Sequence, residues 1–220
     1  MITAAAPDDS SRQMLAKVPQ ITALFWVTKI FATTFGETAG DALSMSLNLG
    51  YLLSTFIFAG IFVLAVYLQI KSKVFHPFLY WFAIIASTTV GTTLADYVDR
   101  SLGIGYVGGS TILLSLVCLS LWFWHKVEGT ITPHVVHQPR TELFYWLTIT
   151  FSQTLGTALG DWSADTAGLG YTGGIVLFSG LIILIFLLYK FTSVSRVLLF
   201  WAAFVLTRPL GAVVGDFLDK

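Results

Sequence analysis

Charged residues are scarce in this chain, and their scarcity argues against a soluble fold. Asp, Glu, Lys and Arg make up 11% of the 220 residues, hydrophobic residues make up 55%, and the mean hydropathy is +0.79. A typical soluble chain has roughly 25% charged residues, so a soluble fold of this sequence would lack the charge to cover its exterior. Long runs nearly free of charge are the pattern that a lipid bilayer imposes. We therefore predict an all-α, polytopic transmembrane helical bundle with the lipid bilayer as its partner.

Cysteine and catalytic motifs are nearly or wholly absent. The single cysteine, Cys118, excludes a disulfide framework and a thiolate metal cluster. The formal net charge is zero, which disfavours the basic face that nucleic-acid binding requires. The sequence contains neither a His-Glu-x-x-His motif nor a nucleophile elbow. We expect no enzyme, no cofactor and no nucleic-acid partner.

What the chain does contain is one pattern that occurs four times. Each copy opens with a Trp, places a Gly ten residues later and places an Asp five residues after that Gly. The first three copies add a Gly-Tyr pair, whose Tyr comes ten residues after the Asp. The positions are Trp26, Trp81, Trp146 and Trp201, then Gly36, Gly91, Gly156 and Gly211, then Asp41, Asp96, Asp161 and Asp216. This periodicity indicates tandem structural units, and we interpret the Trp residues as anchors at the membrane interface.

Seven segments are long and apolar enough to cross a bilayer core of about 30 Å, which takes roughly 20 helical residues. We predict helices over 22–45, 52–70, 78–99, 107–126, 142–164, 173–191 and 195–217. The odd-numbered helices carry the Trp and Asp of each repeat, and the even-numbered helices are almost purely apolar. Each repeat then forms a helical hairpin whose turn holds the Gly-Tyr pair, with the Gly ending the first helix.

These helices divide the chain into four parts. They are an N-terminal tail (1–20), transmembrane repeats 1 and 2 (21–126), an inter-repeat loop (127–141), and repeat 3 with the first half of repeat 4 (142–220). The tail has no apolar core before a small-residue cleavage site, so we do not expect a secretory signal. The loop contains His134 and His137, a spacing that suits two metal ligands but lacks the third and fourth that a site needs. We interpret the loop as a junction between two pairs of repeats.

The basic residues lie mostly at one end of the predicted helices. Only Arg100 and Lys220 lie on the side of the Gly-Tyr turns. The other side carries Arg12, Lys17, Lys71, Lys73, Lys126, Arg140, Lys190 and Arg196. Because cytoplasmic loops are enriched in Lys and Arg, we predict a cytoplasmic N-terminus in a multi-pass protein of the cell inner membrane.

Two-helix units with a recurrent Trp and a Gly-x-x-x-(Gly/Ala)-Asp signature resemble the bacterial integral membrane proteins built from four copies of a repeat of unknown function. The resemblance covers about residues 24–220 and rests on four matching copies. It implies four hairpins, hence eight helices, and no particular activity. The sequence ends at Lys220, where the fourth turn is expected, so either the sequence is truncated or the last hairpin is incomplete. Closure of a pseudo-symmetric bundle is therefore an open question.

Polar residues recur on one face of each odd helix. Positions 7, 11 and 15 after each Trp lie four apart and share a helix face, and the small residues at positions 10 and 14 adjoin them. The polar sets are Thr33-Glu37-Asp41, Thr88-Thr92-Asp96, Gln153-Thr157-Asp161 and Arg208-Ala212-Asp216. The small residues beside them are Gly36 and Gly40, Gly91 and Ala95, Gly156 and Gly160, and Gly211 and Gly215. We predict that the odd helices pack together inside the bundle through these faces, because small residues let helices approach closely. The apolar even helices then face the lipid.

Carboxylates at membrane depth cost about 2.5–3.5 kcal/mol on insertion scales, and they often mark ion pathways. We predict a transporter or channel for a small cation, with the carboxylates, Thr hydroxyls and Gln153 lining the pathway. Glu37 and Asp41 lie one helical turn apart at its centre, and Arg208 is their counter-ion. Oxygen ligands suit Mg²⁺, Ca²⁺, Mn²⁺, Na⁺ or H⁺, so a divalent metal ion stays open as a substrate.

The alternative is a structural or regulatory membrane protein whose polar faces only pack helices together. The sequence leaves this alternative, the identity of any metal and the oligomeric state open. Two further expectations concern charged residues outside these sets. Lys29 is expected to extend to the cytoplasmic interface, and Asp99, Arg100 and Asp165 are expected to be solvated at the outer turns.

Overall fold

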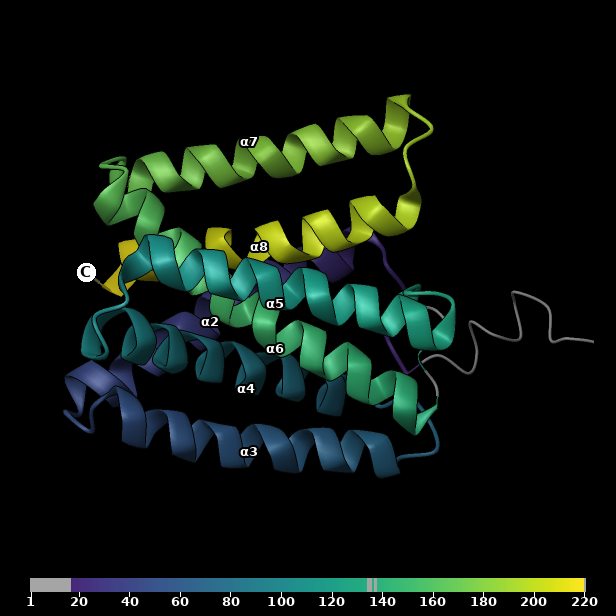
Figure 1. The fold of residues 1–220 in the computed structure, drawn as a ribbon, viewed down its shortest axis with the longest axis horizontal. Helices are drawn as coiled ribbons and strands as arrows, with labels where there is room; N and C mark the ends of the chain where they lie inside the picture. The colour runs from purple at the N-terminus through teal and green to yellow at the C-terminus, as the bar shows by residue number, and fades with distance from the viewer. Residues whose placement is uncertain (1–16, 134–135, 137, 220) are drawn as a thin grey trace, which may run out of the picture.

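The computed structural model describes residues 17–133, 136 and 138–219, and this part of the chain forms seven long helices without a β-strand (Figure 1). The helices are α2 (Ala23–Asp41), α3 (Tyr51–Lys71), α4 (Pro77–Asp96), α5 (Gly105–Glu128), α6 (Pro139–Asp161), α7 (Gly170–Phe191) and α8 (Arg196–Asp219). The predicted all-α class and the seven helices are confirmed. His134, His137 and most of the predicted N-terminal tail lie outside the described residues.

Local sequence signals set several helix ends. Pro77 and Pro139 occupy the first turn of α4 and α6, where the missing N–H of proline costs no hydrogen bond. At the start of α2 the Oγ1 of Thr22 accepts a hydrogen bond from the backbone N–H of Phe25 at 3.4 Å. Each of these three inner helices is thus started by a residue suited to that position.

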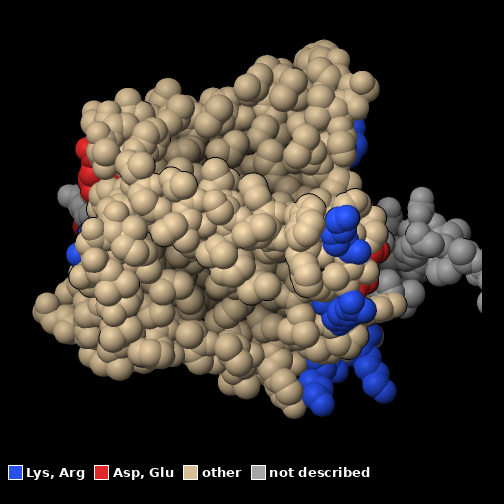
Figure 2. Space-filling view, in the orientation of Figure 1, with Lys and Arg blue, Asp and Glu red and all other residues tan. Residues whose placement is uncertain are grey.

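Length and composition fit the helices to a bilayer. Five helical segments are long and apolar enough to span it: Tyr51–Lys71, Pro77–Ser101, Gly105–Glu128, Gly170–Phe191 and Arg196–Asp219. The 21 residues of α3, at about 1.5 Å each, cover about 31 Å, close to the thickness of a hydrocarbon core. In Figure 2 the side of the molecule is tan, and most Lys and Arg side chains gather at the end where the inter-repeat loops lie. The chain is a multi-pass helical membrane protein.

The helices form two layers. In the inner layer α2 and α6 each contact both α4 and α8, so the four helices make a ring. In the outer layer α3 packs on α4, α5 on α6 and α7 on α8. The apolar windows of α4 and α8 are 67% buried, whereas those of α3, α5 and α7 are 17%, 28% and 11% buried. The predicted division into inner odd helices and outer even helices is therefore confirmed.

The ring closes through four glycines that stand ten residues after the repeat Trp. Each faces the residue that stands seven after the Trp in the next repeat, and a Cβ atom at the glycine would lie closer than 3.0 Å to it. The pairs are Gly36 with Thr88, Gly91 with Gln153, Gly156 with Arg208 and Gly211 with Thr33. The fourth pair joins α8 back to α2, so the inner ring closes although only seven helices are present among the described residues.

A second set of glycines, fourteen residues after the repeat Trp, packs in the same way one helical turn further along. Gly40, Gly160 and Gly215 are buried, and each faces the residue that stands eleven after the Trp in the next repeat. A Cβ atom would lie 2.9 Å from the Cβ of Thr92 at Gly40, 3.0 Å from that of Ala212 at Gly160, and 2.8 Å from that of Glu37 at Gly215. The sequence placed these glycines on the packing face of their own helix, and the structure adds the residue that each one faces.

The outer helices depart from the predicted hairpins. An outer helix packs chiefly on the inner helix of the following repeat, because the flanks of its own inner helix are taken by inner neighbours. As a consequence α2 carries no outer helix among the described residues. Phe31 and Phe35 of α2 are 71% and 59% exposed, whereas the residues equivalent to Phe35, Val90 in α4 and Leu210 in α8, are buried.

Three turns of π-helix separate the inner helices from the outer ones. They are η1 (Ala42–Ser46), η2 (Tyr97–Ser101) and η4 (Trp162–Thr166), and each follows directly on the repeat Asp. Such wide turns are rare and often occur at functional sites. Gly50, Gly105 and Gly170 then adopt φ of 76°, 74° and 64° where the outer helices begin. The prediction that this Gly ends the preceding helix is wrong, because the π-turn ends it and the Gly starts the next one.

Candidate ion pathway within the inner ring

The inner helices meet at a set of buried polar side chains, which we call the polar layer (Glu37, Thr92, Thr157 and Arg208). The Nη2 atom of Arg208 lies 2.6 Å from the Oε2 atom of Glu37. The same nitrogen donates a hydrogen bond to Thr92 Oγ1 at 2.8 Å and another to Thr157 Oγ1. One guanidinium of α8 therefore contacts α2, α4 and α6 at once. Arg208 is 0% exposed and Glu37 is 2% exposed, so the pair is inside the protein.

Glycines make room for this pair. Gly156 of α6 lies against the Cβ and Cγ atoms of Arg208, and Gly215 of α8 lies against the Cβ atom of Glu37. A methyl group at either glycine would overlap the stem of the charged residue. The small and polar positions of the repeat thus act together, because a glycine on one helix leaves the space that the charged side chain of the neighbouring helix occupies.

Three carboxylates lie together just beyond the polar layer, and we call them the acidic group (Glu37, Asp41 and Asp216). All three are buried, and one carboxylate oxygen from each lies within 4.8 Å of the other two. Carboxylates this close repel one another unless protons or cations neutralise them. Three oxygen donors also suit a hard cation. The sequence predicted the pair Glu37 and Asp41, and the structure adds Asp216 from the other end of the chain.

The acidic group is adjacent to a pocket at the end of the bundle where the Gly-Tyr turns lie. The pocket has a volume of about 270 Å³ and is lined by Thr38, Asp41, Ala42, Met45, Ser46 and Asp219. Asp41 thus belongs both to the acidic group and to the wall of the pocket.

The other two repeat aspartates, Asp96 and Asp161, are paired with an arginine. Arg100 of η2 lies between them, with Nε 3.0 Å from Asp96 Oδ1 and Nη2 3.2 Å from Asp161 Oδ2. Arg100 Nε also donates a hydrogen bond to the Tyr106 hydroxyl at 3.0 Å, and that hydroxyl donates to Asp165 Oδ2 at 3.2 Å. The four predicted pathway aspartates therefore fall into two pairs in different surroundings. The division arises because only the second repeat has an arginine at this position.

The expectation of solvated charge at the outer turns holds for only part of the set. Asp165 is exposed. Arg100 is exposed as well, and it bridges two inner helices through its ion pairs. Asp99 is buried, and its carboxylate packs against the Cα position of Gly109 in α5. The expectation is wrong for Asp99, which is buried, whereas Arg100 is exposed and also forms ion pairs with two inner helices.

Lys29 does not extend to the membrane interface, so that prediction is wrong. Its side chain is 0% exposed. The Nζ atom donates hydrogen bonds to the backbone oxygen of Phe204 at 2.9 Å and to Thr207 Oγ1 at 2.6 Å. It also lies 4.0 Å from the centroid of the Phe204 ring, within the range of a cation–π interaction. The Lys29 side chain points across the α2–α8 contact to α8, and therefore toward the interior of the protein.

The remaining polar residues of the predicted pathway form hydrogen bonds inside the ring. Gln153 Nε2 donates to Thr88 Oγ1 at 2.9 Å, which joins α6 to α4. Thr33 Oγ1 donates to the backbone oxygen of Ile30 at 2.9 Å within its own helix. These three residues lie one helical turn before the polar layer in sequence, and they are outside the acidic group.

Several buried polar atoms of this region have no hydrogen-bond partner in the part of the chain that the structure describes. They include Nε and Nη1 of Arg208 and Oε1 of Gln153. Native proteins leave few buried polar groups unpaired, and each such group calls for an explanation.

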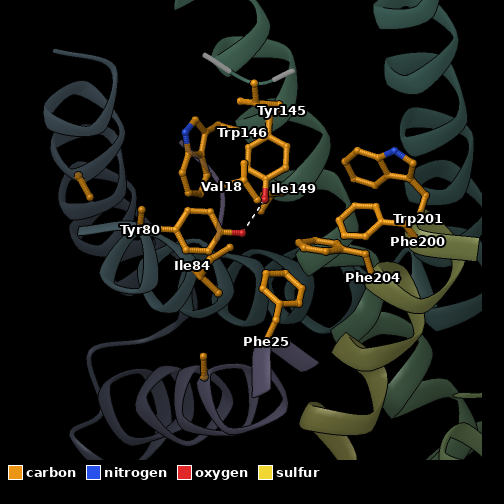
Figure 3. Packing of buried hydrophobic residues seen from close by; sticks show 14 of the residues in the cluster. Val18, Phe25, Tyr80, Ile84, Tyr145, Trp146, Ile149, Phe200, Trp201 and Phe204 are labelled. Atoms are coloured by element: carbon orange, nitrogen blue, oxygen red, sulfur yellow. Dashed lines mark hydrogen bonds between the residues drawn. The ribbon is translucent and has the colours of Figure 1, made fainter. Parts of the chain in front are cut away.

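Aromatic side chains fill the opposite end of the inner ring (Figure 3). The hydroxyl groups of Tyr80 and Tyr145 lie 2.6 Å apart at the centre of this cluster. Trp146 and Trp201 are each 3% exposed and pack within it. Both Trp side chains thus pack inside the bundle, whereas the sequence predicts anchors at the membrane interface. Trp26 and Trp81 are partly buried at its edge.

Sequence signals existed for both charged residues that the predicted pathway leaves out. Lys29 stands four residues before Thr33, so it extends the polar stripe of α2 by one helical turn. Arg100 stands four residues after Asp96, the spacing of an ion pair on one helix. Both signals give the face on which the residue lies, but neither identifies the partner across the ring.

The chain belongs to the family described as "Repeat of Unknown Function (DUF347)". The family model matches four tandem segments, residues 24–75, 79–130, 144–195 and 199–220. No curated protein and no solved structure matches the chain.

Proposed function

We propose that this member of the repeat family moves a small cation, a metal ion or a proton, across the membrane through its inner ring. The observation that supports the proposal is the acidic group, in which Glu37, Asp41 and Asp216 bring three buried carboxylates within 4.8 Å of one another. Carboxylates at membrane depth are costly, and three together need positive charge nearby. A transported cation supplies that charge.

The proposed route starts at the pocket beside Asp41. The ion passes from Asp41 to Glu37, where Arg208 competes for the same carboxylate at 2.6 Å. Binding of a cation to Glu37 weakens the ion pair between Glu37 and Arg208, and release of the cation restores the ion pair. The guanidinium is thus the counter-ion that keeps the site near neutrality when no cation is bound.

The second candidate is a structural or regulatory protein in which the polar layer only joins helices. It is favoured by the contacts of Arg208 with three other inner helices. Helix packing by polar groups works best when every buried group is paired. Three carboxylates within 4.8 Å of one another repel rather than join helices, which favours the transport proposal.

The test is ion flux into liposomes that contain the purified full chain. Mn²⁺, Mg²⁺, Ca²⁺, Na⁺ and H⁺ are each supplied outside, with an ion-sensitive dye inside. The variants are Asp216→Asn and Glu37→Gln, which remove one negative charge each and keep the size of the side chain. Glu128→Gln, at the opposite end of the bundle from the acidic group, is the matched control.

We expect flux of one or more ions for the unaltered chain and for Glu128→Gln, and loss of that flux to the level of empty liposomes for both acidic-group variants. Elution profile and thermal unfolding of each variant show whether it is folded. Absence of flux for all five ions, with the protein inserted and folded, contradicts the proposal and favours the structural role. Flux of the unaltered chain that persists in Asp216→Asn and Glu37→Gln removes the acidic group from the mechanism.

A further inference from the structure

Lys29 lies in a layer of otherwise apolar residues at the edge of the aromatic cluster, next to the polar layer. The residues three after each repeat Trp are Lys29, Ile84, Ile149 and Phe204, which we call the belt, and all four are 0% exposed. Lys29 is the one titratable residue of the belt. Any ion that crosses between the aromatic cluster and the acidic group has to pass this layer.

The contacts of Lys29 suit an amine as well as an ammonium. Its Nζ atom meets a backbone oxygen at 2.9 Å, a threonine hydroxyl at 2.6 Å and an aromatic ring. Two of these are hydrogen-bond acceptors, and a neutral amine still has two N–H donors for them. No carboxylate lies within ion-pair distance of Lys29 in the described part of the chain. Loss of the proton therefore breaks no ion pair.

The charges around Lys29 work against a metal ion. Arg208 of α8 is close enough for its charge to act on Lys29. Glu37 follows eight residues later on α2, about 12 Å along the helix. The aromatic cluster on the other side contributes the hydroxyls of Tyr80 and Tyr145 and no charge of its own. A divalent cation at the belt would meet two positive side chains among apolar ones, whereas a proton needs only Lys29 to change its state.

We propose that Lys29 carries protons through the belt, which makes the proton the ion that the inner ring transports. The inference rests on the proposed function and specifies its substrate. In the step at the belt, the ammonium of Lys29 releases one proton, which water between the belt and the acidic group relays to a carboxylate about 12 Å further along α2, leaving an amine and a carboxylic acid. The amine then takes one proton from the side of the aromatic cluster and becomes an ammonium again. Charge and protons balance in both steps.

The experiment compares Lys29→Arg and Lys29→Met with the unaltered chain in liposomes. Arginine keeps the charge and the donors but cannot lose its proton in a protein, and methionine removes both. Lys73→Met, in the loop between α3 and α4, is the matched control. A potassium gradient with valinomycin sets the membrane potential, one dye inside reports pH, and a second dye in parallel liposomes reports Mn²⁺.

We expect proton flux for the unaltered chain and for Lys73→Met, and its loss to the level of empty liposomes for both Lys29 variants. Proton flux of Lys29→Arg at the rate of the unaltered chain overturns the role of Lys29. If Lys29→Met does not fold, Lys29→Arg alone decides, because it retains the charge and the hydrogen-bond donors. Flux of Mn²⁺ without flux of protons overturns the inference but leaves cation transport standing. Flux of neither ion, together with none of the other cations, overturns both.

Discussion

The ion pair of Glu37 and Arg208 gives the most direct test of the polar layer. Arg208→Met leaves the carboxylate of Glu37 2% exposed and without its guanidinium at 2.6 Å. Removing one partner of a buried ion pair costs about 3–5 kcal/mol, whereas replacing both partners by apolar residues is often neutral. Thr92 keeps a partner in either case, since its hydroxyl also lies 3.2 Å from the backbone oxygen of Thr88. We therefore expect Arg208→Met to destabilise the protein by about 3–5 kcal/mol, and Glu37→Met/Arg208→Met to recover most of that loss.

The measurement is a double-mutant cycle of the free energy of unfolding in mixed detergent micelles. The two single variants and the double variant are compared with the unaltered chain. Destabilisation of the double variant equal to the sum of the two single effects would refute the direct pairing. The double variant also tests the transport proposal, because a folded protein without the pair should lose the flux of the unaltered chain if the pair lies in the pathway.

Two further predictions concern packing. Gly91→Ala places a methyl group closer than 3.0 Å to the backbone of Gln153, whereas Gly60→Ala on the outer helix α3 meets nothing within 4 Å. The gain in helix propensity is common to both changes, so we expect Gly91→Ala to be less stable than Gly60→Ala by about 1–3 kcal/mol. Equal thermal unfolding of the two variants would contradict the close crossing of α4 and α6. Tyr80→Phe leaves the hydroxyl of Tyr145 without its partner at 2.6 Å and should cost about 1–3 kcal/mol. The double change to Phe should recover part of that loss in the same unfolding assay, and no recovery would show that the two hydroxyls do not interact.

The sequence was sufficient for features that repeat along the chain. The spacing of four between Thr33, Glu37 and Asp41 gives the inward face of α2 without any knowledge of its neighbours. The lack of charge in the outer helices likewise gives the lipid-facing layer. Both follow from local periodicity, and both are confirmed in the fold.

Contacts between repeats were beyond the reach of the sequence. The partner of Glu37 stands 171 residues away at Arg208, and Asp216 joins the acidic group from the same distant helix. Such contacts depend on the closure of the ring and on which neighbouring helix packs against each glycine, as Thr92 of α4 packs against Gly40 of α2. The burial of Lys29 has the same origin, because only the position of α8 decides whether that side chain points to lipid or to the interior.

Divergence among the repeats indicates where the proposed pathway lies. The Trp, the Gly and the Asp are the same in all four copies and build the ring, whereas positions 3, 7 and 11 after the Trp differ. Among the twelve residues at these positions only Lys29, Glu37 and Arg208 are charged, and all three belong to α2 or α8. These helices are the first and last of the ring, and α2 is the one inner helix without an outer helix in the described part of the chain. At these three positions α4 and α6 supply no charged group. Under the proposed function the ion route therefore follows the crossing of α2 and α8, with α4 and α6 contributing hydroxyl groups from the side.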